Sequence, residues 1–286
     1  MSGLLKSNLT VATGTALSRL TGLVRFGVLA AVLGGTALSD AYLLANETPN
    51  IVYELLVGGV LSATLVPLFT SFDAHDDDES RNVVISTALV VISATMVVAV
   101  IAAPLVFRAF SARVDADVDP ELFRSVGTTL SRIFLVQILF YGLTGIANAF
   151  LNSRRRFFAA AWSPILPNLV IIATLLSLPA TGADGYVLDD VIENTRIRLT
   201  LGLGATIGVA SMAVVLIPAT YRAGLRWNFV WNPRHPAVKK LLTLSFWTLG
   251  FVAANIVALT VVRNMTEPGS SGATAYFLAF TFFILP

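Results

Sequence analysis

The chain has 286 residues, of which 56% are hydrophobic and 13% are charged, and its mean hydropathy is +0.78. This composition is typical of an integral membrane protein and excludes an ordinary soluble domain. Cysteine is absent, which excludes disulfides, thiolate metal sites and thiol nucleophiles, while the net charge of +2 combines acidic and basic residues that lie in different connections.

Eight apolar stretches follow one another along the chain. A bilayer span needs about 20 mostly apolar residues, and seven stretches are long enough. We predict these complete spans at about residues 8–34, 40–72, 83–111, 123–150, 157–179, 199–221 and 237–264. The eighth begins near Ser271 and is still too short to span at Pro286, so we expect the sequence to be an amino-terminal piece of a longer protein.

The first span contains two arginines, Arg19 and Arg25, and lacks a small-residue cleavage site, which predicts a retained helix rather than a signal peptide. At about 100° per residue its polar and small residues share one arc. These residues are Gly14, Thr15, Ser18, Arg19, Thr21, Gly22 and Arg25. We expect this arc to face protein or water rather than lipid. A central arginine costs at least about 2.5 kcal/mol in a membrane helix, so for the two arginines we favour a wet cavity. The alternative is that either arginine extends to an interface.

The chemistry of two guanidinium groups narrows the ligand. Guanidinium is permanently charged and presents a planar fork of donors, which suits phosphate or carboxylate better than a proton relay. Arg19 and Arg25 together therefore predict an anionic ligand, and a pyrophosphate would satisfy both.

Polar residues and helix breakers interrupt the second span. Asp40 at its start is a candidate amino-terminal cap of that helix, which does not exclude a second role. Pro49 is expected to kink or break the helix, and two adjacent glycines supply another flexible point, as in the gates of transporters. The candidate gating residues are Asp40, Asn46, Glu47, Pro49, Asn50, Gly58 and Gly59.

Other polar residues within the spans have several interpretations. Glu47 and Glu54 are seven residues apart and would share a helix face, where either could pair with a first-span arginine or couple to protons. We expect Arg263, near the end of the seventh span, to snorkel to the interface. For Asn148 and Asn168 we expect hydrogen bonds between helices.

Basic residues are concentrated in two connections, at residues 152–158 and 221–240. The positive-inside rule places both, and the amino terminus, on the cytoplasmic side. The second connection also carries Trp227, Phe229 and Trp231, which predicts that it lies along the membrane interface. We therefore divide the chain into a six-helix lobe at residues 1–222, a cytoplasmic interfacial linker at 223–236 and the start of a second lobe at 237–286.

A short internal echo supports this division. SDAYLLA at residues 39–45 resembles GATAYFLA at 272–279, six spans later, as in a parallel repeat of two six-helix lobes. The expected fold class is therefore an all-α integral membrane protein, a two-lobe transporter with a complete first lobe. His75 and His235 lie in connections and no catalytic or metal-binding spacing is visible, so we predict no enzyme activity, no metal and no cofactor.

Three stretches within residues 18–69 resemble the amino-terminal signature of the MurJ (MviN) family of lipid II flippases. They are SRLTGLVR, LGGTALSDAYLLANETPN and GGVLSATLVPLF. The resemblance implies a V-shaped transporter of the multidrug/oligosaccharidyl-lipid/polysaccharide exporter superfamily in the bacterial cytoplasmic membrane. Its central cationic cavity would accept the diphosphate and sugars of lipid II and move them from the inner to the outer leaflet for peptidoglycan synthesis.

The resemblance also implies roles for single residues. The family's first-helix arginines fall on Arg19 and Arg25, which would bind the diphosphate together with Ser18. Its acidic residue at the start of the second helix falls on Asp40, which would help to close an external gate. Family members often carry an arginine in the eighth helix, where this chain has Thr281.

Two other functions remain open at this point. A cation-coupled multidrug or polysaccharide-lipid exporter of the same superfamily would require buried acidic residues in the first lobe. A non-transporting membrane scaffold of the cell-wall machinery would not require the charges of the cavity. The expected partners are lipid II or a related polyprenyl-diphosphate lipid, membrane lipids and cell-wall synthesis proteins; nucleic acid is not expected.

Overall fold

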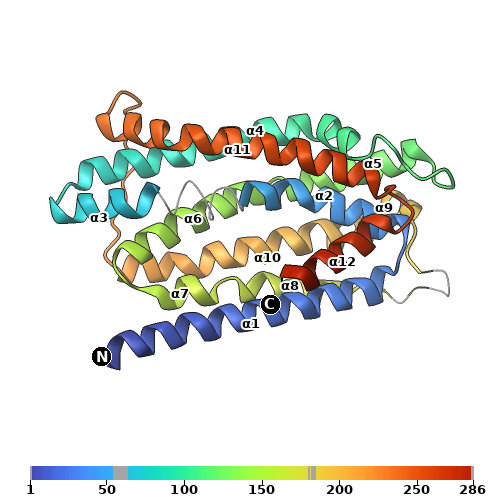
Figure 1. Ribbon diagram of the computed structural model, residues 1–286, viewed down its shortest axis with the longest axis horizontal. Helices are drawn as coiled ribbons and strands as arrows, with labels where there is room; N and C mark the ends of the chain where they lie inside the picture. The colour runs from blue at the N-terminus through green and yellow to red at the C-terminus, as the bar shows by residue number, and fades with distance from the viewer. Residues whose placement is uncertain (1, 54–63, 180, 182–184, 285–286) are drawn as a thin grey trace.

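The computed structural model describes residues 2–53, 64–179, 181 and 185–284 and contains helices but no strand within them. The helices run along the long axis of the molecule, so the connections gather at its two ends (Figure 1). The helices are α1 (Ser2–Leu33), α2 (Ala37–Tyr53), α3 (Val66–Ala74), α4 (Asp78–Phe110), α5 (Pro120–Phe134), α6 (Gln137–Ser153), α7 (Phe157–Trp162), α8 (Ile165–Leu176), α9 (Leu188–Glu193), α10 (Thr195–Arg222), α11 (Pro236–Met265) and α12 (Gly272–Ile284).

Most of the predicted spans are present as helices. In the described part of the chain, five segments are long and apolar enough to cross a membrane: Leu9–Leu33, Asp78–Phe110, Pro120–Ser153, Phe157–Leu176 and Thr195–Arg222. They confirm the predicted first, third, fourth, fifth and sixth spans. The 30-residue helix α11 occupies the predicted seventh span. The predicted second span contains α2 and α3, and residues 54–63 between them lie outside the described residues.

Local sequence signals determine where several helices begin. Asp119 accepts hydrogen bonds from the backbone of Glu121 and Leu122 at the start of α5, and Asn194 caps α10 in the same way. Asp77 accepts a hydrogen bond from the backbone of Ser80 at the start of α4. Hydrogen bonds from Ser80 lower the pKa of the Asp77 carboxyl, because they stabilise its charged form.

Two clusters of buried apolar side chains hold the helices together. One joins the second half of α1 to α2, α5, α8 and α10. The other joins α3, α4 and α6 to the last turns of α10. Helix α11 packs along α4, and α12 packs against α2, so the last two helices lie on the outside of this bundle (Figure 1).

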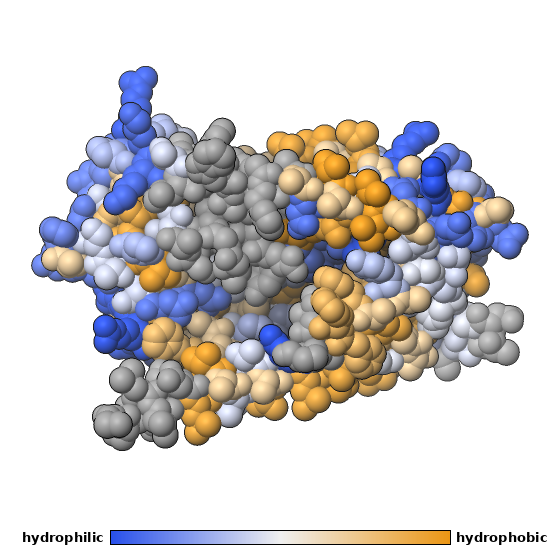
Figure 2. Space-filling model, viewed as in Figure 1, coloured by the Kyte–Doolittle hydropathy of each residue, from blue (hydrophilic) through white to orange (hydrophobic). Residues whose placement is uncertain are grey.

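The surface has the distribution expected of a membrane-spanning protein. Figure 2 shows hydrophilic residues at both ends of the long axis and a hydrophobic zone between them. Large apolar side chains such as Ile101 and Leu105 of α4 and Ile217 of α10 are exposed. Because a soluble protein rarely exposes so much contiguous apolar surface, this zone is best understood as lipid-facing.

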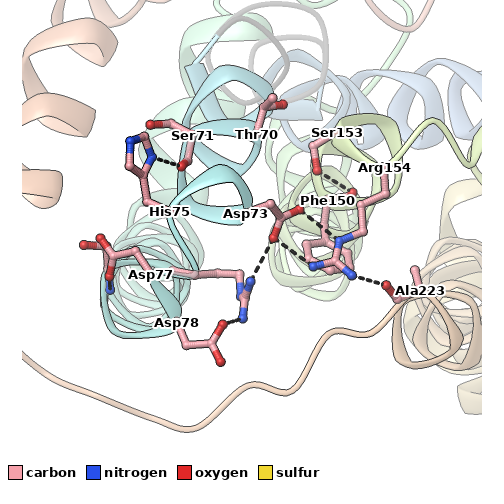
Figure 3. Close-up of polar contacts among 12 residues, drawn as sticks. Thr70, Ser71, Asp73, His75, Asp77, Asp78, Phe150, Ser153, Arg154 and Ala223 are labelled. Atoms are coloured by element: carbon pink, nitrogen blue, oxygen red, sulfur yellow. Dashed lines mark hydrogen bonds and ion pairs between the residues drawn. The ribbon is translucent and has the colours of Figure 1, made fainter.

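A polar cluster centred on Asp73 ties several helix ends together. Its carboxylate accepts two hydrogen bonds from Arg154, at 2.9 and 2.8 Å, and one from Arg81 at 2.9 Å. Figure 3 shows that the Arg154 guanidinium, at the end of α6, also reaches the carbonyl of Ala223 just after α10. One carboxylate thus links α3, α4, α6 and α10 at the same end of the molecule.

The predicted linker at 223–236 crosses this end as an extended segment. Ser86 of α4 binds it at two points, because its hydroxyl accepts hydrogen bonds from the Trp227 indole at 3.2 Å and from the Val230 backbone at 3.0 Å. Trp227, Phe229 and Trp231 are all exposed. The linker is therefore held against α4 with its aromatic rings on the surface.

Candidate functional site: a cationic cavity beside a closed end

The polar arc of α1 is divided between helix packing and a cavity. Gly14 is buried against α7, where an added Cβ would lie 2.9 Å from the carbonyl oxygen of Ala161. The side-chain amide of Asn168 in α8 donates hydrogen bonds to the Ser18 carbonyl and the Thr21 hydroxyl, each at 3.1 Å. The expected helix-to-helix bonding of Asn168 is thus confirmed. The arc therefore faces protein on one side, where α7 and α8 pack on it, and both expected surroundings, protein and a cavity, are present.

Three residues of this arc, Ser18, Arg19 and Gly22, line a cavity of about 460 Å³ between α1, α2, α11 and α12. Its polar and small lining residues include Ser18, Arg19, Gly22, Glu47, Asn50 and Arg263. Aromatic rings of α12 cover another side. The cavity therefore combines two guanidinium groups and one carboxylate with apolar walls, which gives it a net positive charge among these groups and suits an anion attached to an apolar chain.

Arg25 lies in a separate, smaller pocket of about 40 Å³, together with Asn46. Phe26, Asn50 and Phe277 line both this pocket and the larger cavity, so the two are adjacent. The separation of the arginines follows from helix geometry, because residues six apart differ by about 120° around the axis. Asn46 Oδ1 is buried here without a hydrogen-bond partner in the described part of the chain.

Arg263 is a buried component of the cavity wall. Its side chain is 2% exposed, and its Nη2 donates to both carboxylate oxygens of Glu47, at 2.9 and 2.8 Å. The guanidinium also lies over the rings of Phe277 and Tyr276, 4.0 and 4.8 Å from their centroids. The expectation that Arg263 snorkels to the interface is therefore wrong, because an ion-pair partner and two rings are available inside.

Asp40 does not cap its own helix, although the sequence had suggested this role, because it lies inside the first turn of α2. Helix α2 begins three residues earlier, where Thr36 and Ser39 exchange side-chain and backbone hydrogen bonds. The fully buried Asp40 instead caps α12: Oδ1 accepts from the backbone and hydroxyl of Thr274, at 2.8 and 2.5 Å, and Oδ2 accepts from the Gly269 backbone at 2.9 Å. Its negative charge thus lies at the amino terminus of the last helix.

Further contacts surround Asp40 at what we call the closed end, where residues 34–36, 111–119 and 266–271 meet. The Ser39 and Thr274 hydroxyls are 2.9 Å apart, and the Ser271 hydroxyl donates to the Gly35 carbonyl. Asn264 connects the same turn to α4 through a hydrogen bond to the Ala109 carbonyl at 2.8 Å. The turn between α11 and α12 is thereby held on two sides.

The remaining predicted gating residues lie along α2 or outside the described residues. Asn50 accepts a hydrogen bond from the Tyr141 hydroxyl at 3.0 Å. Helix α2 continues through Pro49 as far as Tyr53, so of the two predicted effects of Pro49 the break is wrong and the kink stays a prediction. Gly58 and Gly59 fall in residues 54–63, which are not described. For Asn148, the buried Oδ1 has no partner within the described part of the chain.

Sequence reasoning missed the contribution of α11 and α12 to this site. Nothing local marks Arg263 as buried, because it lies near the end of an apolar span where snorkelling is the usual outcome. The partners of Asp40 are backbone groups and a threonine more than 220 residues away, which leave no pattern in the sequence. Among the described residues there is no cluster of three or more potential metal ligands.

The family of the chain follows from comparison with known proteins. The profile of the family described as Lipid II flippase MurJ matches residues 29–286. The chain belongs to the MurJ family. A protein of Rhizobium meliloti named probable lipid II flippase MurJ is 30% identical over 274 residues, which cover 92% of this chain and 49% of the relative. Lipid II flippase MurJ of Burkholderia cenocepacia is 26% identical over 285 residues, covering 96% and 52%.

A solved structure agrees with the fold. Lipid II flippase MurJ in an inward closed conformation matches with a TM-score of 0.72 and 22% identity, over 97% of this chain and 55% of that one. This confirms the predicted all-α, two-lobe transporter fold class. The chain spans about half the length of the curated relatives it matches. Its MurJ membership and its apolar helices make it a multi-pass membrane protein of a transporter family.

Proposed function

We propose that the full-length protein moves lipid II, or a related polyprenyl-diphosphate lipid, from the inner to the outer leaflet of the bacterial cytoplasmic membrane. The observation that carries this proposal is the cationic cavity of about 460 Å³ within a bundle of apolar helices. Membership of the MurJ family supports the same substrate class. Transport by alternating access, rather than chemistry on the lipid, is the proposed activity.

The proposed substrate-binding residues are Arg19, Arg25 and Ser18. Arg19 and Ser18 line the larger cavity, and Arg25 lines the pocket beside it. A diphosphate offers several oxygens to such donors, and each charge-assisted hydrogen bond contributes about 1.5–3 kcal/mol. The apolar walls would accommodate the first isoprenoid units of the lipid chain.

The proposed gate is the closed end around Asp40. Its buried carboxylate accepts two hydrogen bonds from α12 and one from the turn before it, and it would alternate between this bonded state and a hydrated state when the helices separate. Helix α2 would transmit a movement of Asp40 to the cavity through the residues that follow on the same helix, Asn46, Glu47, Pro49 and Asn50. Gly58 and Gly59 retain their proposed role as flexible points.

The proposed orientation places the amino terminus and the Asp73 cluster in the cytoplasm. The basic connections at 152–158 and 221–240 lie at that end, and the positive-inside rule supports this orientation. The closed end would then face outward, so the cavity would receive substrate from the inner leaflet. The division at residues 1–222, 223–236 and 237–286 remains part of the proposal, as do contacts with cell-wall synthesis proteins.

Complementation of cells depleted of their own lipid II flippase tests this function. We expect the full-length protein to restore growth and Arg19→Gln or Arg25→Gln to fail, because each neutral amide loses the charge that recognises the diphosphate. The matched control is Arg198→Gln, a partly exposed arginine at the start of α10 that lines neither pocket, and it is expected to restore growth.

Three outcomes would contradict the proposal. If the wild-type protein reaches the membrane and does not restore growth, lipid II transport is wrong. If Arg19→Gln and Arg25→Gln restore growth as well as wild type, and Asp40→Asn does too, a scaffold role replaces transport. Export of cationic dyes without restored growth would favour the cation-coupled exporter.

A further inference from the structure

Arg263 carries three N–H groups that have no acceptor among the described residues. Its Nη2 is used by Glu47, but Nε and Nη1 are buried and lack a hydrogen-bond partner there. The side chain is 2% exposed, so bulk water does not satisfy these donors. Buried unpaired donors on a charged group are costly, which makes the arrangement unfavourable unless something in the cavity accepts from them.

The cavity beside Arg263 offers space for such an acceptor. Arg263 lines the same cavity of about 460 Å³ as Arg19 and Ser18, although it comes from α11 and they come from α1. The Phe277 and Tyr276 rings hold the plane of the guanidinium, and Glu47 fixes one of its nitrogens. The guanidinium is therefore held in a fixed orientation at the cavity wall, which is the condition under which a planar guanidinium binds an oxyanion well.

We propose that Arg263 binds the diphosphate of the transported lipid from the α11 side of the cavity, with Glu47 as the counter-ion that retains it when no substrate is bound. This inference rests on the proposed function and adds a binding residue to it. One diphosphate contacted by Arg19 and Arg263 would link α1 to α11. Glu47 competes with the ligand electrostatically, so it lowers affinity and favours release.

The two members of the ion pair are therefore expected to have opposite effects on binding. Removing Arg263 removes donors to the ligand, whereas neutralising Glu47 leaves Arg263 in place without its competitor. If the ion pair has only a structural role, substitution of either residue lowers the stability of the fold, and neither substitution changes the affinity for a diphosphate. The sign of the Glu47 effect is thus the discriminating observation.

Calorimetric titration of the purified full-length protein with farnesyl diphosphate measures this effect, with farnesol as the control for binding of the apolar chain alone. We expect Arg263→Gln to weaken diphosphate binding by about tenfold or more, the loss of at least one charge-assisted hydrogen bond. Glu47→Gln is expected to strengthen it several-fold. The double variant Glu47→Gln/Arg263→Gln leaves no uncompensated buried charge and is expected to bind as weakly as Arg263→Gln.

Controls separate this inference from the proposed function. Thermal unfolding of each variant identifies those that fail to fold, and the double variant is the one most expected to remain folded. If Arg19→Gln weakens binding but the folded double variant binds like wild type, the role of Arg263 is wrong and the proposed function stands. If wild type binds farnesyl diphosphate no better than farnesol, both are wrong. Arg198→Gln is expected to bind like wild type.

Discussion

Asp40 shows how a single carboxylate can connect two distant parts of this chain. It is fully buried and accepts hydrogen bonds from Gly269 and from both donors of Thr274. A carboxylate can accept at both oxygens, whereas an asparagine side chain has one acceptor and one donor group. In an asparagine at this position, the side-chain NH₂ would face either the Gly269 N–H or the Thr274 donors, so one hydrogen-bond donor would lie against another.

Asp40→Asn is predicted to loosen the closed end without unfolding the bundle. An unsatisfied buried donor costs about 1–3 kcal/mol, which corresponds to a rise of about 5-fold to 150-fold in the population of the open form. Hydrogen exchange measured by mass spectrometry should become faster at residues 266–275, while the Asp73 cluster remains protected. Asp189→Asn, at an exposed site in α9, is the control, and unchanged exchange in Asp40→Asn would contradict the gating role.

At the residue scale, the sequence predicted which side chains are unusual but not their partners. Arg19 and Arg25 are recognisable because charge is rare in apolar helices, and Asp40 because it opens a span. The burial of Arg263 depends on Glu47 and on two rings of α12, which are brought together only by the tertiary fold. Long-range polar pairing has no periodicity and so leaves no local signal.

At the element scale, α1 packs against α7 on one side and lines the cavity on another. One side approaches α7 so closely that Gly14 has no room for a Cβ, and another side faces the cavity through Arg19. Small residues allow such close approach between membrane helices. The distribution of small and charged residues around α1 therefore determines where the helix packs and where the cavity opens.

Gly14→Val is predicted to destabilise the protein through this contact. The added Cβ would lie 2.9 Å from the Ala161 carbonyl oxygen and 2.9 Å from the Trp162 ring, which is closer than van der Waals contact. Such overpacking costs about 1–3 kcal/mol. We expect a lower unfolding temperature in detergent. Gly27→Val in the same helix is the matched control, because no atom lies within 4 Å of the Cβ added at Gly27. Equal stability of the two variants would contradict close α1–α7 packing.

Most elements were predictable because long apolar runs determine membrane spans. The break between α5, which ends at Phe134, and α6, which begins at Gln137, was not predictable, because residues 133–141 contain neither glycine nor proline. The α7–α8 break has a signal in Pro164, which lacks a backbone N–H. Composition alone therefore locates a span but does not show whether its helix is continuous.

At the scale of the whole molecule, the cavity and the closed end define one conformational state. The cavity lies between α1, α2, α11 and α12, and the contacts of Asp40 and Gly35 hold the turn between α11 and α12 against α2. Transport by alternating access requires these contacts to break once in each cycle. A covalent bond across them would trap the protein in this state.

Gly35 and Ser271 are well placed for such a bond. A Cβ built on Gly35 lies 3.5 Å from the Ser271 Cβ, within the range of disulfides. The chain has no cysteine of its own, so Gly35→Cys/Ser271→Cys introduces a single possible pair within it. Each single variant serves as a control, because it changes one side chain and cannot form the bond.

The most direct test is lipid II translocation by Gly35→Cys/Ser271→Cys, in a full-length protein otherwise free of cysteine, in cells depleted of their own flippase. We predict that oxidation stops translocation in the double variant, that a reductant restores it, and that neither single variant responds. Undiminished translocation by fully cross-linked protein would contradict alternating access through the closed end.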